Sequence, residues 1–241
     1  MNDIAALPDI AGSQPDEPKT LAEAAYRRLR RDIIEGIHPP GEKLRVEHLK
    51  DHYAVGAGTL REALQLLVTD ALVVAQGQRG FRVAPISLDD FEDITRTRVL
   101  LETAALQQSI ECGDDAWEAE ILARAHMLSK LEAIDASEQM LDEWDQRHQA
   151  FHSAIVAGCG SQYLLQMRER LFDLAARYRF IWLRKTVLSV EMLEDKHDQH
   201  QTLTEAILAR DAARASELMR QHLLTPIPII QQAMSGKLLT Q

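Results

Sequence analysis

The sequence predicts a mostly α-helical protein with two domains: a winged helix-turn-helix with a small β-hairpin, then an all-α bundle of about six helices. Three observations lead to this fold class. Two helical segments flank a short glycine-containing turn, two β-prone runs follow directly, and helical periodicity then dominates to about residue 233. The chain has 241 residues, 46% of them hydrophobic, which is enough to give each domain a core.

The N-terminal segment 1–18 contains three prolines and no sustained apolar period, so we expect a disordered tail there. The first domain is expected over 19–84. Its first helix begins at Thr20, whose hydroxyl suits an N-cap, and ends at Gly36. Segment 37–44 holds two consecutive prolines and is predicted to be a turn, because proline cannot extend a helix.

A short helix is expected over 45–53 and a second over 59–70, joined by the glycine-containing turn 54–58. This order is typical of a helix-turn-helix. The runs 72–75 and 80–84 are β-prone and enclose four polar or glycine residues, which predicts a hairpin. A hairpin in this position is a wing.

After a linker at 85–87, the second domain is expected over 88–230, with a flexible tail over 231–241. Short breaks containing glycine or proline separate its helices. The pattern predicts helices at roughly 88–111, 115–134, 137–157, 161–185, 190–209 and 212–224. Such a series is typical of an α-helical bundle.

Charge is unevenly distributed between the two domains. Between Lys19 and Val83 there are eleven Lys and Arg residues and eight Asp and Glu residues, which gives this segment a net charge of +3. The whole chain has a net charge of −10, so the other 176 residues together carry −13. A locally basic domain attached to an acidic body indicates double-stranded DNA as the partner of the first domain.

The start of the helix at 59–70 is the expected DNA-reading element, because recognition helices contact base edges through their N-terminal residues. Arg61 could bind guanine through two donors, and Thr59 could be an N-cap or a phosphate donor. In the hairpin, glycines allow close approach of the backbone and Arg79 lies at the tip; the alternative is a purely structural hairpin. The predicted DNA-binding residues are Arg45, Gly58, Thr59, Arg61, Gly77 and Arg79.

Four histidines in the second domain fall on apolar stripes of three helices: His148, His152, His200 and His222. A lone histidine on such a face is usually a satisfied core residue. Four together are costly to bury without a shared partner, and a divalent metal would be that partner. Nitrogen ligands favour zinc, nickel or another late first-row metal over magnesium or calcium.

Arg98 also lies at the centre of an apolar stripe, with Glu102 one turn later. The structural explanation is an internal ion pair. The functional explanation is a guanidinium that binds the carboxylate of a small effector. We predict an effector pocket formed by Arg98, His148, Tyr178 and Arg179.

Cys112 and Cys159 are the only cysteines, no N-terminal apolar run has the length of a signal peptide, and no stretch approaches a membrane span. We therefore expect a cytoplasmic protein without membrane contact. The alternative function is a metal-dependent hydrolase that uses the histidines. We do not expect the protein to be an enzyme, because no Ser or Cys is placed as a nucleophile beside a base and the sequence contains no phosphate-binding loop.

Several linked motifs of the first domain resemble the DNA-binding half of the GntR superfamily. The chain departs from many relatives just before the recognition helix, where Ala57 and Gly58 replace a basic or hydroxyl residue, and this leaves Arg61 as the residue to carry over. The motifs are Ile33-Ile34-Glu35-Gly36, Pro40-Gly41-Glu42-Lys43-Leu44, Thr59-Leu60-Arg61-Glu62-Ala63-Leu64, Leu72-Val73 and Gly80-Phe81-Arg82-Val83.

The second domain resembles the FCD ligand-binding domain of the FadR subfamily. The motifs are Arg98-x-x-x-Glu102, Phe151-His152-x-Ala154-Ile155, His200-x-x-Leu203-x-x-Ala206-Ile207 and Arg220-Gln221-His222-Leu223. The resemblance implies a homodimer and a metal held by one aspartate and three histidines, above which a carboxylate effector binds. This chain has His148 where that aspartate is common.

Within this subfamily, the stretch from His148 to Trp182 is similar to that of a glutarate-responsive repressor. This likeness implies a repressor that a short dicarboxylate such as glutarate releases from DNA, with Arg98 and Arg179 binding the two ends of the effector.

Overall fold

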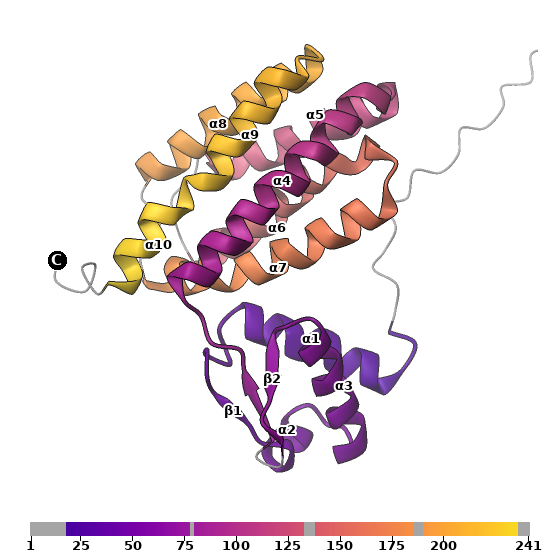
Figure 1. Ribbon diagram of the computed structural model, residues 1–241, viewed down its shortest axis with the longest axis vertical. Helices are drawn as coiled ribbons and strands as arrows, with labels where there is room; N and C mark the ends of the chain where they lie inside the picture. The colour runs from indigo at the N-terminus through magenta and orange to yellow at the C-terminus, as the bar shows by residue number, and fades with distance from the viewer. Residues whose placement is uncertain (1–17, 78–79, 133–137, 186–189, 236–241) are drawn as a thin grey trace, which may run out of the picture.

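The computed structural model describes residues 18–77, 80–132, 138–185 and 190–235. The predicted tail over 1–18 therefore lies almost wholly outside the described residues, as does the wing-tip residue Arg79. Within those ranges the fold class is confirmed: a small winged domain and a larger helical bundle are joined by the linker that follows residue 84 (Figure 1).

The first domain begins with helix α1 (Leu21–Ile34). The Thr20 hydroxyl caps it by accepting a hydrogen bond of 3.1 Å from the Glu23 amide, as predicted. The helix-turn-helix consists of α2 (Val46–His52) and α3 (Ala57–Thr69). Apolar faces of the three helices form the core with Leu29, Leu64 and Leu67, which are fully buried.

The wing is a three-stranded antiparallel sheet with the order β1-β3-β2, formed by β1 (Lys43–Leu44), β2 (Val73–Ala75) and β3 (Phe81–Val83). The sequence predicted a turn across 37–44, so strand β1 is a correction. Lys43 lies opposite Arg82 in the ladder, because the chain leaving the proline turn runs along the free edge of β3. This pairing depends on tertiary contacts, and a strand of only two residues is too short to show alternating apolar and polar side chains in the sequence.

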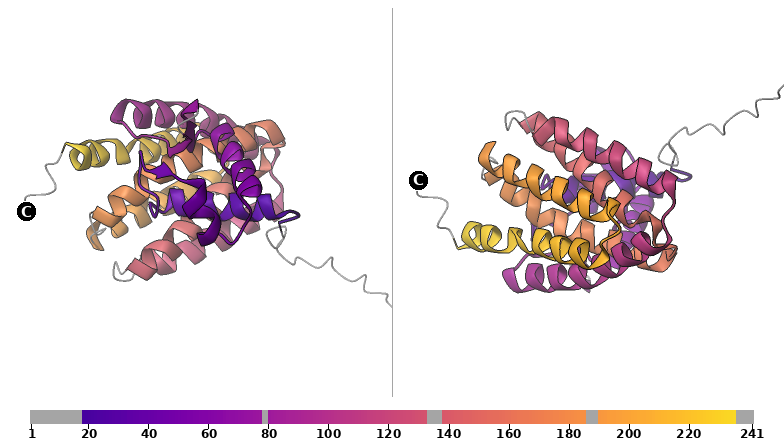
Figure 2. Two further views of the ribbon diagram at one scale, coloured as in Figure 1. Left: turned by 90° about the horizontal axis from the view of Figure 1, so that it is seen from below. Right: turned by 90° about the horizontal axis from the view of Figure 1, so that it is seen from above.

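The second domain is a helical bundle whose main core lies between its long helices (Figures 1 and 2). Its elements are α4 (Leu88–Cys112), α5 (Asp115–Glu132), α6 (Glu138–Val156), the 3₁₀ turn η2 (Ala157–Cys159), α7 (Gln162–Lys185), α8 (Val190–Leu208), α9 (Ala212–Leu224) and α10 (Pro226–Met234). Helices α4 and α9 lie side by side, as do α5 and α6.

Helix α10 differs from the prediction, which ended the last helix at 224 and placed a flexible tail over 231–241. Pro226 begins this helix instead of only interrupting the chain, because proline fits the first helical turn, where its missing N–H has no helical partner. The side chain of Ile230 is buried in the small cluster that contains Phe91 and Tyr178. Residues 236–241 lie outside the described residues.

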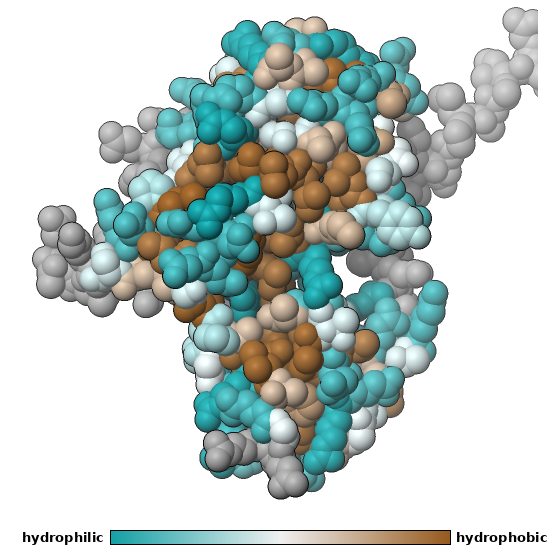
Figure 3. Space-filling view, viewed as in Figure 1, coloured by the Kyte–Doolittle hydropathy of each residue, from teal (hydrophilic) through white to brown (hydrophobic). Residues whose placement is uncertain are grey.

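The two domains meet along α7, which passes over the first domain (Figure 1). The carboxylate of Asp173 pairs with Arg30 of α1, and the Arg170 guanidinium donates to the carbonyl of Thr69 at the end of α3. Leu174 packs against both the core of the first domain and the small cluster around Phe91. In the space-filling view the domains join at a narrow waist, where hydrophobic residues reach the surface (Figure 3).

None of the described helices has both the length and the hydropathy needed to cross a bilayer.

Candidate functional site

The recognition helix starts earlier than predicted, and this changes the role of Thr59. Gly56 is the N-cap of α3, so Gly58 and Thr59 lie in its first turn, and Thr59 is not the N-cap. Gly58 is exposed, and a side chain added there would meet nothing within 4 Å. The side-chain face of this helix start is therefore open, and the N-terminus of a helix favours a phosphate.

A basic hollow of about 600 Å³ lies beside this helix start. Arg45, the N-cap of α2, and Arg61 of α3 both line it, together with Lys43 and Gly80 from the wing sheet. The fold thus brings the predicted residues Arg45 and Arg61 together with residues of the wing around one hollow. Lys43 was not predicted as a site residue, because the strand that positions it was read as a turn.

Other basic residues of the first domain have structural roles. Arg82 donates to the carbonyl of Gly41 and to the side chain of Gln76, each at 2.9 Å, and so braces the wing.

Of the residues predicted in the wing turn, Gly77 has a positive φ angle of 54°, as does its neighbour Gly80 with 88°, which is why glycine suits these positions. The placement of Arg79 lies outside the described residues.

The bundle brings the four predicted histidines together. His148 and His152 come from α6, His200 from α8 and His222 from α9, and each offers one nitrogen within 4.8 Å of the others. All four are buried, with exposed fractions of 1% to 7%. The Nε2 atoms of His152 and His222 are 3.1 Å apart.

Burial lowers the pKa of His152 well below its usual value, and the positive charges of His200, Arg168 and Arg98 lower it further. Burial also lowers the pKa of His222, with the Lys196 charge as the next contribution. Both imidazoles are therefore neutral at pH 7. Neutral imidazole is the form that ligates a metal.

A hydrogen-bonded chain orients His222. The side-chain amide of Gln199 donates to Asp195 at 2.7 Å, which leaves its carbonyl oxygen facing His222 at 2.9 Å from Nδ1. Nδ1 of His222 is then the protonated nitrogen, and Nε2 presents a lone pair to the cluster. Metal-bound histidines are commonly oriented by such an outer hydrogen bond. Sequence reasoning missed Asp195 and Gln199.

The donor set fits a transition metal. Nδ1 of His152 is buried and has no hydrogen-bond partner among the described residues. The histidines therefore do not complete one another's hydrogen bonding. Four imidazole nitrogens suit zinc or another late first-row ion. In a tetrahedral zinc site the donors would be about 3.3 Å apart, so modest side-chain movement would complete the coordination.

A buried ionic network adjoins the histidines. Glu102 accepts from Arg98 at 2.7 Å on one side and lies 3.5 Å from Nε of Arg168 on the other. Both guanidinium groups lie over the ring of Phe172, at 5.0 and 5.2 Å. The internal Arg98–Glu102 pair, which was the structural alternative, is therefore present.

Arg168 is the residue that sequence reasoning missed here. It is 4% exposed, its Nη1 donates to the Ser153 hydroxyl at 3.0 Å, and its Nη2 is buried without a hydrogen-bond partner among the described residues. Arg168 lies one turn before Phe172 on the apolar stripe of α7. The same signal had identified Arg98 on α4, so the sequence did contain the information.

Tyr178 has a different role from the one predicted. Its hydroxyl donates to Asp90 at 2.5 Å and accepts from the Ser87 amide at 3.2 Å, so it fastens the start of α4 to α7 at the domain junction. It packs on Phe91, with ring centroids 4.8 Å apart, and not on the histidines. The side chain of Arg179 lies outside the described residues.

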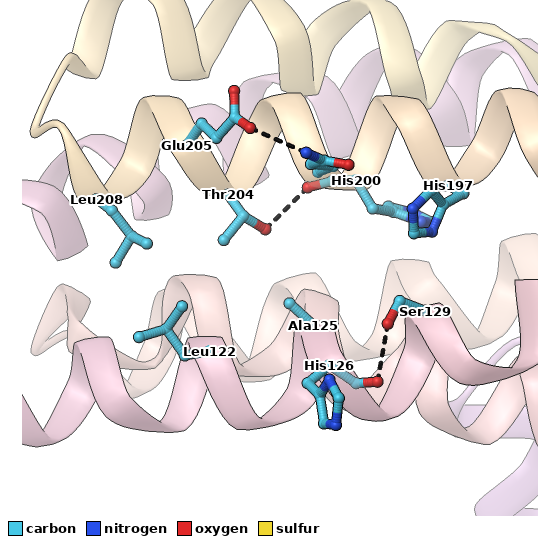
Figure 4. A pocket seen from close by; sticks show the side chains of 10 residues that line it. Leu122, Ala125, His126, Ser129, His197, His200, Thr204, Glu205 and Leu208 are labelled. Atoms are coloured by element: carbon cyan, nitrogen blue, oxygen red, sulfur yellow. Dashed lines mark hydrogen bonds between the residues drawn. The ribbon is translucent and has the colours of Figure 1, made fainter.

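A hollow of about 330 Å³ between α5 and α8 reaches His200 from the outer side (Figure 4). Leu122 and Ala125 of α5 point toward Thr204 and Leu208 of α8 across it. The Thr204 hydroxyl donates to the His200 carbonyl at 2.8 Å, so one wall of the hollow braces the helix turn that carries a cluster histidine.

Comparison with protein families gives two matches. Residues 21–83 match the model described as bacterial regulatory proteins, gntR family, and residues 93–225 match the FCD domain. The first match falls within the winged domain, and the second falls within the helical bundle, from α4 to the end of α9.

Among individual proteins, the HTH-type transcriptional repressor GlaR of Escherichia coli K12 is 69% identical over 211 residues, covering 88% of this chain and 96% of that protein. An uncharacterized HTH-type regulator, BphR of Paraburkholderia xenovorans LB400, is 39% identical over 216 residues, covering 89% and 86%. The solved structure of E. coli McbR/YncC is similar, with a TM-score of 0.75 at 20% identity, covering 89% and 99%.

Proposed function

Because this chain belongs to the GntR family of DNA-binding transcriptional regulators, with an FCD domain behind its winged helix-turn-helix, we propose that it is a repressor controlled through the four-histidine centre. The proposal is that a small carboxylate, glutarate or a similar short dicarboxylate, binds beside that centre. Its binding releases operator DNA in the cytoplasm. The observation that carries the proposal is the buried group of four histidines next to the Arg98–Glu102–Arg168 network.

The chemistry of this centre favours an anion. Neutral imidazoles of His152 and His222 lie in the electrostatic field of Arg98 and Arg168, and Nη2 of Arg168 has no hydrogen-bond partner in the described structure. A carboxylate accepts two parallel hydrogen bonds from a guanidinium. Arg168 is therefore the residue we assign to one end of the effector, with Arg98 beside it.

A metal held by His148, His152, His200 and His222 would add positive charge that attracts a carboxylate. The chain's own contribution is to hold His152 and His222 neutral and to orient His222. Gln199 keeps the Nε2 lone pair of His222 directed inward, and burial keeps His152 unprotonated.

Helix α7 supports a route from the effector to DNA. It carries Arg168 and Phe172 on the side of the network, and Asp173, one residue later, pairs with α1 of the DNA-binding domain. An effector changes DNA affinity only if it binds two arrangements of the protein differently. A carboxylate that draws Arg168 toward itself would displace α7 and with it the docking of α1 and α3.

We also propose a homodimer, which places two recognition helices on a two-fold operator. The hydrolase alternative receives no support, because the matched families and relatives are transcriptional regulators.

The test is operator release measured by fluorescence anisotropy, with DNA from the protein's own promoter and increasing glutarate. We expect wild-type protein to release DNA and an Arg168→Gln variant to need at least tenfold more glutarate, since losing one charged contact costs this much. Arg124→Gln, an arginine on α5 whose partner is Glu120 of the same helix, is the control. Release at the same glutarate concentration in both variants would remove Arg168 from the effector site.

A further inference from the structure

A second cavity, of about 350 Å³, lies at the junction of the two domains, apart from the histidine centre. Ala71 follows the recognition helix and contributes one wall, the linker residues from Ala84 to Ser87 a second, and Ile94, Leu174 and Arg177 the remainder. This volume falls within the usual range of about 300–1,000 Å³ for small-molecule sites. The walls are mainly apolar, and the polar side chains that line the cavity are those of Ser87, Asp90 and Arg177.

Arg177 is the unusual feature of this cavity. It is 4% exposed, and its Nε is buried without a hydrogen-bond partner among the described residues. Its Nη1 donates a long hydrogen bond of 3.3 Å to the Ala84 carbonyl in the linker. Burial lowers its pKa, with the Tyr178 hydroxyl and the Asp90 carboxylate acting in the opposite direction.

A buried guanidinium without a carboxylate partner is costly, because the desolvated charge is not compensated. No Asp or Glu within the described residues forms an ion pair with Arg177. Asp90 lines the same cavity, but its Oδ2 accepts from Tyr178. The guanidinium is therefore matched to an anion that comes from outside the chain.

We propose that the junction cavity binds a small aliphatic monocarboxylate, with its carboxylate on Arg177 and its hydrocarbon chain against Ile94 and Leu174. The side chain of Asp90 disfavours a second negative charge in the same space. Selectivity for a monoanion separates this site from the dicarboxylate site proposed at the histidine centre.

A ligand here contacts both domains at once. Ala71 directly follows the recognition helix and its C-cap, whereas Ile94 and Leu174 belong to α4 and α7 of the bundle. Occupancy stabilises the arrangement of the two domains in which this cavity exists. The site is therefore a second input to DNA binding, and it depends on neither the metal nor Arg168.

The test uses the full-length protein and butyrate as the probe, followed by NMR. The Nε–H signal of Arg177 is assigned by its absence from an Arg177→Gln variant. We expect butyrate to shift this signal and the amides of Ala71 and Ser87 saturably, whereas glutarate at the same concentration shifts them at least tenfold less. In Arg177→Gln the butyrate concentration at half-saturation of the Ser87 shift should rise at least tenfold.

Two further variants make the result decisive. We expect Arg168→Gln to keep the butyrate response. A response lost in Arg168→Gln and kept in Arg177→Gln would assign butyrate to the histidine centre and overturn the proposal. Ile94→Phe narrows the cavity while leaving Arg177 intact, and should abolish the response even if Arg177→Gln does not fold. Unchanged butyrate binding in Ile94→Phe, or no shift in the wild type at millimolar butyrate, would also overturn it.

Discussion

Nε2 of His152 lies 3.1 Å from Nε2 of His222, so these two buried imidazoles face each other through the same kind of atom. Only one of them can donate a proton to the other when both are neutral. Gln199 already accepts from Nδ1 of His222, which makes His152 the donor and leaves its own Nδ1 without a partner. A metal ion could take the place of the shared proton, because the Nε2 lone pairs of both imidazoles would then point at the ion.

The first prediction concerns metal content. We expect the purified protein to carry a late first-row metal, and His152→Ala or His222→Ala to lose it, as measured by inductively coupled plasma mass spectrometry. His126→Ala is the matched control, since His126 is exposed on α5 and stands outside the cluster. Equal metal content in all three variants would show that these four histidines are not the ligands.

The second prediction isolates the outer hydrogen bond. Gln199→Leu removes the acceptor that fixes Nδ1–H of His222 without removing any ligand. We expect metal affinity to fall by about 10–100-fold, as is usual when such a partner of a histidine ligand is lost. Competition with a chromophoric chelator measures it. Gln201→Leu, on the same helix with its amide donating to Glu205, should keep wild-type affinity.

The third prediction is the pH dependence of the metal-free protein. Burial lowers the pKa of His152 and His222 in the folded state, so the unfolded chain binds more protons as pH falls through its own histidine pKa of about 6.5. Stability from these groups is therefore fully present above that pH and is lost below it. Urea unfolding of chelator-treated protein between pH 8 and 5 should show this decline.

The control for the pH prediction is His222→Leu, which removes one buried imidazole and should unfold with a shallower pH dependence. The same slope in wild type and variant would mean that other groups control acid stability.

The fold could be predicted largely from the sequence, because periodicity of apolar residues marks each long helix and Thr20 marks a helix start. Strand β1 and helix α10 could not, because a two-residue pairing and a proline at a helix start leave no periodic signal. Of the site, the histidine cluster followed from stripes on three helices. Tyr178 lies on such a stripe too, but the sequence does not show which cluster a buried helix face packs into, because that depends on tertiary packing. In the structure Tyr178 packs into the small cluster at the domain junction.

The fourth prediction tests the recognition helix. Arg61 is exposed near the start of α3 and lines the basic hollow with Arg45. We expect Arg61→Ala to weaken operator binding by about 1–3 kcal/mol, which is the discrimination that one bidentate base contact provides. Binding to unrelated DNA should change less. Arg124→Ala on α5, with its partner Glu120, serves as the control, and full operator affinity in Arg61→Ala would refute the assignment.

The last prediction concerns coupling between the domains. Asp173 on α7 pairs with Arg30 on α1, and burial raises the pKa of Asp173 although the Arg30 charge opposes it. The cost of burying the carboxylate offsets part of the attraction, although the Asp173 charge raises the pKa of Arg30, so Asp173→Asn should not unfold the protein. It should instead reduce the ratio of operator Kd values with and without glutarate by at least about fivefold, the lower end of typical coupling. Glu118→Gln breaks a comparable pair with Arg210 inside the bundle and should leave that ratio intact. An unchanged ratio in Asp173→Asn would mean that the effector signal reaches DNA by a route other than the contact between α7 and α1.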